Sequence, residues 1–227
     1  MERQVAGSRT CAMTDYSEVV QDAAIIWHYM ALAKFVSILQ NGALWFVRLD
    51  CLRDDPFEGR CGHGGRFWEK VDAHTRKGCV NCWAFDPEES DLMWHAYAPG
   101  FGVAIQSTKR MLKASLAPSS PDRIFIGQVQ YGTDRSKIPP DSPYIAAFGK
   151  PGAFKWEQEL RVLIPYESEH YPPGIEPPCP GKLVPVQLSS LVAEVWIAPN
   201  SEKWFKQVVE FELRKYGLDN IHVKERS

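Results

Sequence analysis

The clearest change from polar to apolar positions lies at residues 155–165, where a polar start leads into an apolar run at 162–164 that a proline closes. An apolar run of this length next to a turn residue is typical of a strand buried on both faces. Because side chains alternate along a strand, Glu157, Glu159 and Arg161 would share one face. Two carboxylates and a guanidinium therefore enter the sheet together.

Two interpretations of this acidic pair stay open. A carboxylate at the mouth of a buried strand costs free energy unless it has a partner. In the first interpretation Arg161 neutralises one or both glutamates, and the set is structural. In the second, one glutamate faces a cleft and acts on a substrate.

The rest of the pattern alternates short strands with short helices. Strands are expected at 23–30, 43–48, 79–85, 101–106, 124–131, 183–186, 193–198 and 221–223. Helices are expected at 32–39, 67–76, 91–98, 108–116 and 199–216, with Gly42 and Gly217 ending the first and the last. We expect a flexible lead-in at 1–22 and a single α+β domain at 23–227, with a mixed, mostly antiparallel sheet and flanking short helices.

Composition narrows the class of protein. A net charge of −2 does not suggest broad electrostatic binding to nucleic acid. No apolar run approaches membrane-spanning length, and no secretory signal opens the chain. The six cysteines are irregularly spaced, which favours reduced thiols. We therefore expect a cytoplasmic protein with no membrane partner.

Four residues are candidate ligands for a zinc ion. Cys61, His63, Cys79 and Cys82 could form a four-ligand set. If Cys79 and Cys82 both lie on the predicted strand, however, they point to opposite faces. The spacing also lacks the regularity of a zinc module, so no metal site is expected.

Several short motifs follow one another between about Ile26 and Pro199. They are Trp27-His28-Tyr29-Met30, Asp55-Pro56-Phe57-Glu58-Gly59, Cys82-Trp83, Glu89-Ser90 with Met93-Trp94 and Tyr97, Gly102-Val103-Ala104-Ile105, and Lys155 with Glu157-Gln158-Glu159-Leu160-Arg161. Together they resemble a family of bacterial and phage proteins known only as a domain of unknown function. This resemblance implies relatedness and brings no established activity.

The segment 157–165 is also similar to the Glu-x-Glu strand of ADP-ribosyltransferases. That resemblance implies an ADP-ribosyltransferase-like fold, NAD+ as substrate and Glu159 as the catalytic residue. An early strand of such enzymes carries an Arg or His that holds the nicotinamide-side ribose and phosphates, and His28 is placed for this role. Their middle strand usually brings a Ser or Tyr. The candidates for that position are Tyr97, Ser107 and Thr108.

The chemistry suits these residues. Cleavage of the glycosidic bond of NAD+ builds positive charge on the ribose, as in sugar hydrolysis. Glu159 would stabilise that charge, and Glu157 would orient or deprotonate an acceptor, which could be protein, nucleic acid or water. His28 would bind the ribose. The aromatic candidates for stacking on nicotinamide are Trp27, Tyr29 and Trp83.

This hypothesis makes a geometric prediction. His28 and Glu159 should lie on the order of 10 Å apart and face one small molecule. Side chains on opposite faces of the sheet would overturn the transferase hypothesis as it is built here on His28 and Glu159. The alternative for His28 is a core histidine whose ring bonds to backbone.

Two other functional classes stay open. Asp55, Glu58, Glu157 and Glu159 could hold Mg²⁺ in a nuclease. Against this, Arg161 stands two residues after Glu159, where a catalytic lysine would be expected. A non-catalytic binding module of a phage or defence system would instead use tryptophans on its surface. Those at 27, 45, 83 and 196 lie on predicted strands, where tryptophan is more often core.

Overall fold

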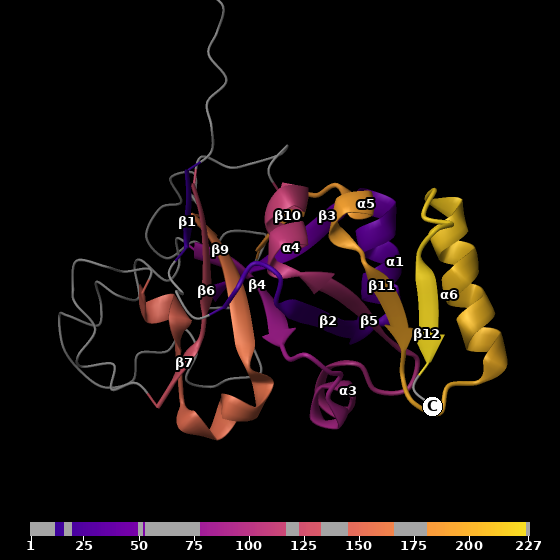
Figure 1. Cartoon of the computed structure of the whole chain (residues 1–227), viewed down its shortest axis with the longest axis horizontal. Helices are drawn as coiled ribbons and strands as arrows, with labels where there is room; N and C mark the ends of the chain where they lie inside the picture. The colour runs from indigo at the N-terminus through magenta and orange to yellow at the C-terminus, as the bar shows by residue number, and fades with distance from the viewer. Residues whose placement is uncertain are drawn as a thin grey trace, which may run out of the picture.

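The computed structural model describes residues 12–15, 20–49, 52, 78–116, 123–132, 145–165 and 181–225. It shows an α+β fold with one large, mostly antiparallel sheet flanked by short helices (Figure 1), so the predicted fold class is confirmed. The predictions for Asp55, Glu58, Cys61, His63 and a helix at 67–76 lie outside the described residues. No helix within the described ranges is long and apolar enough to cross a membrane.

Strands lie near most of the predicted ranges, and also at 12–15, within the expected lead-in, and at 149–150, where none was predicted. They are β1 (Ala12–Asp15), β2 (Ile25–Ala31), β3 (Ala43–Arg48), β4 (Gly78–Phe85), β5 (Gly102–Thr108), β6 (Arg123–Gln128), β7 (Gln130–Tyr131), β8 (Gly149–Lys150), β9 (Glu159–Pro165), β10 (Gly181–Pro185), β11 (Glu194–Ile197) and β12 (His222–Glu225). The main sheet has the order β1-β6-β9-β4-β2-β5-β11-β12, and β3 pairs with β4 and β10. The pairs β1–β6 and β11–β12 are parallel, and the other ladders of this sheet are antiparallel.

Short helices connect these strands. They are α1 (Leu32–Asn41), α3 (Asp91–Tyr97), α4 (Lys109–Leu116), α5 (Leu188–Leu191) and α6 (Lys203–Lys215), with 3-10 segments η4 (Ile145–Phe148) and η5 (Gly152–Glu157). Gly42 and Gly217 have φ of 55° and 74° and end α1 and α6, as predicted. The last helix begins at Lys203, four residues later than the predicted start at Pro199.

The two faces of the sheet carry different layers. On one face, here called the α1 face, the main core joins Phe35, Leu112 and Phe205 of the helices to strand residues such as Ile105. On the other face, here called the α3 face, helix α3 packs Met93 and Trp94 on Trp27, Tyr29 and Ala104. Segment η4 covers the same face further along, where Ala147 and Phe148 pack on Leu163. Figure 1 shows α3 lying apart from α1, α4, α5 and α6.

In the middle of the sheet, the ladder between β2 and β4 is short. Strands β2 and β4 pair only at Ile26 with Phe85 and at Trp27 with Ala84. By contrast, β4 pairs with β9 over almost its whole length, from Gly78 to Ala84. The sheet therefore has two well-paired halves, one around β9 and one around β5, which meet along a short ladder.

Candidate functional site

The chain turns sharply just before β9. Glu157 is the last residue of η5, Gln158 has a left-handed backbone with φ of 41°, and the strand begins only at Glu159. The prediction that Glu157 lies on the strand is therefore wrong, because Pro151 and Gly152 open a 3-10 segment that runs up to it. The turn nevertheless brings both glutamates to one place.

That place is a buried group of four charged side chains, Lys150, Glu157, Glu159 and Arg161, here called the carboxylate cluster. The exposed fractions are 6% for Lys150, 4% for Glu157, 5% for Glu159 and 1% for Arg161. Arg161 donates from Nε to Oε1 of Glu159 at 2.8 Å and from Nη2 to Oε2 at 2.9 Å. Lys150 Nζ lies 2.5 Å from Oε2 of Glu157 and 3.5 Å from Oε2 of Glu159. Two negative and two positive charges thus balance in the interior.

Two tyrosines bond to this cluster. The Tyr97 hydroxyl, at the end of α3, donates to Oε1 of Glu157 at 2.8 Å. The Tyr131 hydroxyl, on β7, accepts the backbone N–H of Glu159 at 2.8 Å. Burial raises the pKa of both hydroxyls well above the usual range, and the neighbouring carboxylates add to that rise. Both tyrosines therefore keep their protons.

The pKa values of the two carboxyl groups are shifted in opposite directions. Burial disfavours the charged form of Glu159, but Arg161 and then Lys150 outweigh it and lower the pKa of Glu159 to about 2. Burial raises the pKa of Glu157 above the usual value, although Lys150 and Tyr97 partly offset that rise. Two neighbouring carboxyl groups whose environments separate their pKa values are the arrangement from which acid and base roles are assigned.

Aromatic rings lie next to the cluster. The Tyr97 and Trp156 rings lie 6.4 Å apart at an interplanar angle of 32°. Lys150 Nζ lies 4.9 Å from the centre of the Phe154 ring. Trp156 is 37% exposed, and Tyr97 and Phe154 are half-buried. A planar ligand could contact these rings from solvent.

His28 does not join the cluster. Registers across β2, β4 and β9 pair Trp27 with Ala84 and Ala84 with Glu159, so these three side chains share the α3 face. His28 is the next residue after Trp27 and therefore points to the α1 face. The prediction that His28 and Glu159 face one small molecule is wrong for this reason.

The contacts of His28 agree with this placement. Its ring stacks on Trp83, a member of the main core, with centroids 5.0 Å apart. Its Nδ1 lies 2.8 Å from the backbone carbonyl of Cys82, which can only accept, so Nδ1 carries the proton. Burial lowers the pKa of His28 to about 4. This is the neutral, backbone-bonded histidine of the structural interpretation.

Tyr29 and Ser107 also make structural contacts. The Tyr29 hydroxyl accepts the N–H of Ser90, and its ring lies 5.0 Å from that of Trp94. Ser107 is 1% exposed and donates to the carbonyl of Leu191 at 2.5 Å. Thr108, the other hydroxyl considered, accepts the N–H of Met111 and caps α4. Of the NAD+-binding candidates His28, Tyr29, Tyr97 and Ser107, Tyr97 is the one whose side chain hydrogen-bonds to a glutamate of the cluster.

The tryptophans divide into buried and exposed sets. Trp27 and Trp83 are 2% and 1% exposed, so neither can stack on a ligand from solvent. Trp45 is 41% exposed although it lies on β3, contrary to the expectation of a core position. It stands opposite Leu183 of β10, which is also exposed.

Sequence reasoning missed Lys150 and Tyr131. Both belong to the short parallel pair β7–β8, in which Tyr131 stands opposite Lys150. A signal for the lysine was present in the charge balance. Two buried glutamates opposed by Arg161 alone leave one negative charge without a partner, and burying such a charge is costly. The missing cation had to come from elsewhere in the chain.

The metal hypotheses gain no ligand set among the residues described. No group of three or more His, Cys, Asp and Glu side chains is placed to hold a metal ion in that part of the chain. Glu157 and Glu159, two of the four carboxylates considered for Mg²⁺, already bond to Lys150 and Arg161. Cys79 is buried and Cys82 half-buried, and neither forms a disulfide.

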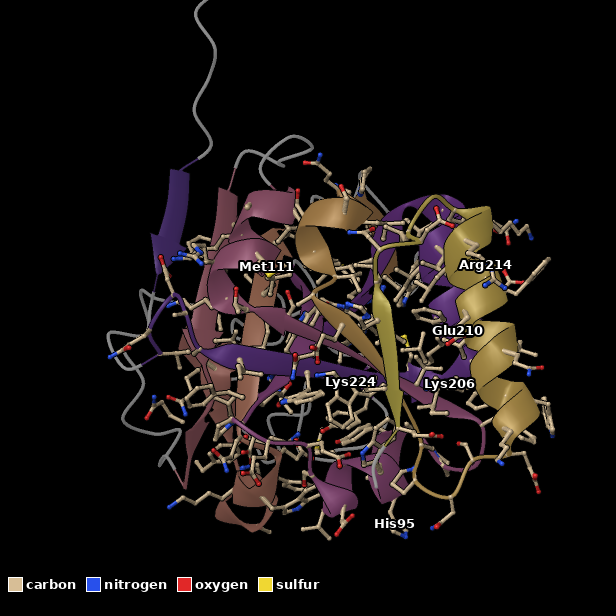
Figure 2. All side chains as sticks on the ribbon, turned by 45° about the vertical axis from the view of Figure 1, so that its right-hand side comes forward. His95, Met111, Lys206, Glu210, Arg214 and Lys224 are labelled. Carbon is tan, nitrogen blue, oxygen red and sulfur yellow. The ribbon has the colours of Figure 1, made fainter. Side chains whose placement is uncertain are left out.

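A hollow of about 460 Å³ lies between α6 and β12, at the other end of the sheet from β9. Lys206, Glu210 and Arg214 line it from α6 (Figure 2), and Asp219 and His222 line it from the following turn and strand. Its charges are of both signs. It contains none of the residues that the sequence singled out.

Comparisons with known proteins give fold-level neighbours only. No family model and no curated protein matches the chain. Two solved structures are similar. One is Thermus sp. 2.9 DarT in complex with NAD+, with 10% identity, a TM-score of 0.44, and coverage of 92% of this chain and 98% of that chain. The other is Thermus sp. 2.9 DarT in complex with carba-NAD+, with 12% identity, a TM-score of 0.44, and coverage of 91% and 97%. Similarity of this size carries no argument about activity.

Proposed function

We propose that the chain is an ADP-ribosyltransferase-like enzyme that cleaves NAD+ at the carboxylate cluster and transfers ADP-ribose to an acceptor. One observation supports this proposal above the others. Two adjacent buried carboxylates, Glu157 and Glu159, have pKa values displaced in opposite directions beneath a partly exposed aromatic surface. The proposal replaces the transferase hypothesis that was built on His28 and Glu159, since that version is overturned by the position of His28 on the other face of the sheet. It assigns no role to His28.

Glu159 would act as a fixed negative charge. Its carboxylate stays ionised because Arg161 and Lys150 hold it, so it faces developing positive charge on the ribose without needing to reorganise. In the reaction the bond between the ribose and nicotinamide breaks, and nicotinamide leaves with the bonding electron pair. The fixed anion would favour the cationic transition state over the ground state.

Glu157 would act on the acceptor. A carboxylate with a raised pKa is a better proton acceptor near neutral pH than an ordinary glutamate. As the acceptor atom forms its bond to the ribose carbon, its proton would pass to Glu157. Tyr97 donates to Oε1 of Glu157 and fixes the direction of that carboxylate. The Tyr97 and Trp156 rings would contact the planar parts of NAD+.

Glutamine variants test these roles. Glu159→Gln should lower nicotinamide release from NAD+ by about a hundredfold or more, because the fixed charge is lost. Glu157→Gln should reduce transfer to an acceptor more than it reduces NAD+ hydrolysis. The measurement is release of nicotinamide from labelled NAD+, first with protein alone and then with cell lysate as a source of acceptors. Glu88→Gln, at an exposed glutamate, is the matched control.

Folding must be measured beside activity. Because Glu159 is buried against Arg161, its glutamine variant is expected to melt at a lower temperature, so all variants are assayed where near-ultraviolet circular dichroism shows them folded. Wild-type protein that releases no nicotinamide, labels no acceptor and gains no thermal stability from NAD+ would contradict the proposal. Ligand-independent binding of a macromolecule would then favour the binding-module alternative.

A further inference from the structure

We propose that Lys150 is a positioning residue whose ammonium group ties the Glu157 carboxylate to the Glu159 carboxylate and holds Glu157 in place for the acceptor. This inference rests on the proposed function for its consequence in catalysis. The tie itself is a statement about the folded protein and can be tested without any activity. No role for Lys150 follows from the motifs in the sequence.

The geometry of Lys150 supports a bridging role. It stands on β8, directly after an apolar 3-10 segment, and pairs with Tyr131 of β7. Its Nζ is within hydrogen-bonding distance of Oε2 of Glu157 and within ion-pair distance of Oε2 of Glu159. The Phe154 ring lies beside the same nitrogen. A lysine side chain that is 5% exposed has little freedom to leave these partners.

The other groups around Glu157 do not replace this contact. From α3, Tyr97 donates a neutral hydrogen bond to Oε1. From β9, Arg161 directs Nε and Nη2 to Glu159 and Nη1 to the carbonyl of Ala147 at 2.6 Å. From β7, Tyr131 bonds to the backbone of Glu159 rather than to a carboxylate. Lys150 is therefore the cation that bonds Glu157 in the part of the chain that the structure describes.

A consequence for the proposed reaction follows. Without the ammonium group, the buried carboxylate of Glu157 would be held by Tyr97 on one oxygen, and its charged form would lose a favourable partner. A raised pKa helps a base only while its ionised form stays populated. The further rise in the pKa of Glu157, together with a less fixed direction of the carboxylate, would leave fewer molecules ready to take up the acceptor proton. Hydrolysis of NAD+ needs Glu159 more than Glu157, so the ratio of transfer to hydrolysis should report on Lys150.

The test uses three lysine variants of the full chain. Lys150→Met removes the charge, Lys150→Arg keeps it, and Lys155→Met is the matched control at an exposed lysine of η5. Carbon-13 NMR of the glutamate carboxyl groups, assigned with Glu157→Gln and Glu159→Gln, follows the Glu157 titration. Lys150→Met should move that titration upward by about one pH unit or more, because an opposite charge in contact is lost. The ratio of transfer to hydrolysis at pH 7 should fall about tenfold, with substantial recovery in Lys150→Arg.

A second measurement covers the case in which Lys150→Met does not fold. Nitrogen-15 NMR of wild-type lysine side chains should show ammonium signals protected from exchange for the buried Lys109 and Lys150, assigned with Lys109→Arg and Lys150→Arg. Glu157→Gln should shift the Lys150 signal and leave the Lys109 signal in place. An unchanged Lys150 ammonium signal in Glu157→Gln, or an unchanged Glu157 titration in folded Lys150→Met, would overturn the inference. If wild-type protein has no activity toward NAD+ while both NMR shifts occur, the proposed function is wrong. The inference that Lys150 links the two carboxylates in the folded protein is then still supported.

Discussion

At the scale of single residues, a left-handed backbone at Gln158 decides how the acidic pair is used. It ends η5 and sends the chain into β9, so the two glutamates approach the same lysine from different elements. On a continuous strand, both would have pointed from the same ladder and competed for Arg161. Arg161 instead serves Glu159, and Lys150 bonds Glu157.

Arg161→Ala should destabilise the fold by about 3–5 kcal/mol, because it leaves the buried Glu159 with weaker partners, the Lys150 ammonium at 3.5 Å and the Cys82 thiol. It also removes the hydrogen bond to the carbonyl of Ala147. Urea unfolding at pH 7 measures the change. Arg110→Ala, at an exposed arginine of α4, should stay within about 0.5 kcal/mol of wild type. Equal stabilities for the two variants would mean that the buried pair adds nothing.

The sequence predicted this pair only in part. Alternating polarity is a local property, so it indicated that Glu159 and Arg161 share a face and need each other. The position of Lys150 depends on how β7 and β8 fold back against β9, which no local pattern encodes. The prediction that His28 shares a site with Glu159 is wrong for a related reason. Its face is set by the register of β2 against β4 and β5, and a change of one residue in the assumed alternation reverses it.

At the scale of elements, strands were predicted better than the segments between them. Strand β3 matches its predicted range, and the bounds of β2, β4 and β5 differ from prediction by at most two residues. Their apolar runs are buried by both layers, so tertiary contacts agree with the local preference. The 3-10 segment η5 was missed because its residues also read as the polar start of a strand.

The turn between α3 and β5 positions the end of α3, which carries Tyr97 of the candidate site. Gly102 begins β5, and a Cβ there would lie 2.0 Å from the carbonyl oxygen of Ala98. Gly102→Ala should therefore cost about 1–3 kcal/mol and displace the end of α3, which carries Tyr97. Thermal melts measure the loss, and fluorescence of Trp156 should respond to movement of the neighbouring Tyr97 ring.

Gly42→Ala is the comparison for that turn. Gly42 has φ of 55°, but a Cβ there meets nothing within 4 Å, so only the backbone cost of about 1 kcal/mol applies. Its helix, α1, packs on the α1 face of the sheet, whereas the carboxylate cluster lies on the α3 face. A Trp156 signal that changes as much in this variant as in Gly102→Ala would show that α3 is not what positions Tyr97.

At the scale of the whole molecule, the cluster makes stability depend on pH in two opposing ways. The pKa of Glu159 falls from an ordinary 4.5 to about 2 on folding, so its ionised form stabilises the protein above about pH 4.5, and this contribution is lost as the pH falls toward 2. The pKa of Glu157 is raised on folding, so its ionised form costs stability, and protonation at lower pH removes that cost.

Urea unfolding at pH 7, 5 and 3 should separate these contributions. The stability gap between wild type and Glu159→Gln should narrow by about 2 kcal/mol between pH 7 and pH 3. The gap for Glu157→Gln should change with the opposite sign. Parallel pH profiles for wild type and both variants would indicate that neither carboxyl group changes its pKa on folding.

The short ladder between β2 and β4 also has a consequence for folding during synthesis on the ribosome. Strands β4, β6 and β9, together with Tyr97 and Lys150, have all left the ribosome once Pro165 has emerged, so the half that holds the cluster can pair early. The other half needs Glu194–Ile197 of β11 to cover the outer edge of β5. During the synthesis of the intervening residues, β5 is joined to the early half only through β2 and its short ladder with β4. A nascent chain at that stage presents an uncovered strand edge, which is the surface that molecular chaperones shield and that neighbouring nascent chains can pair with.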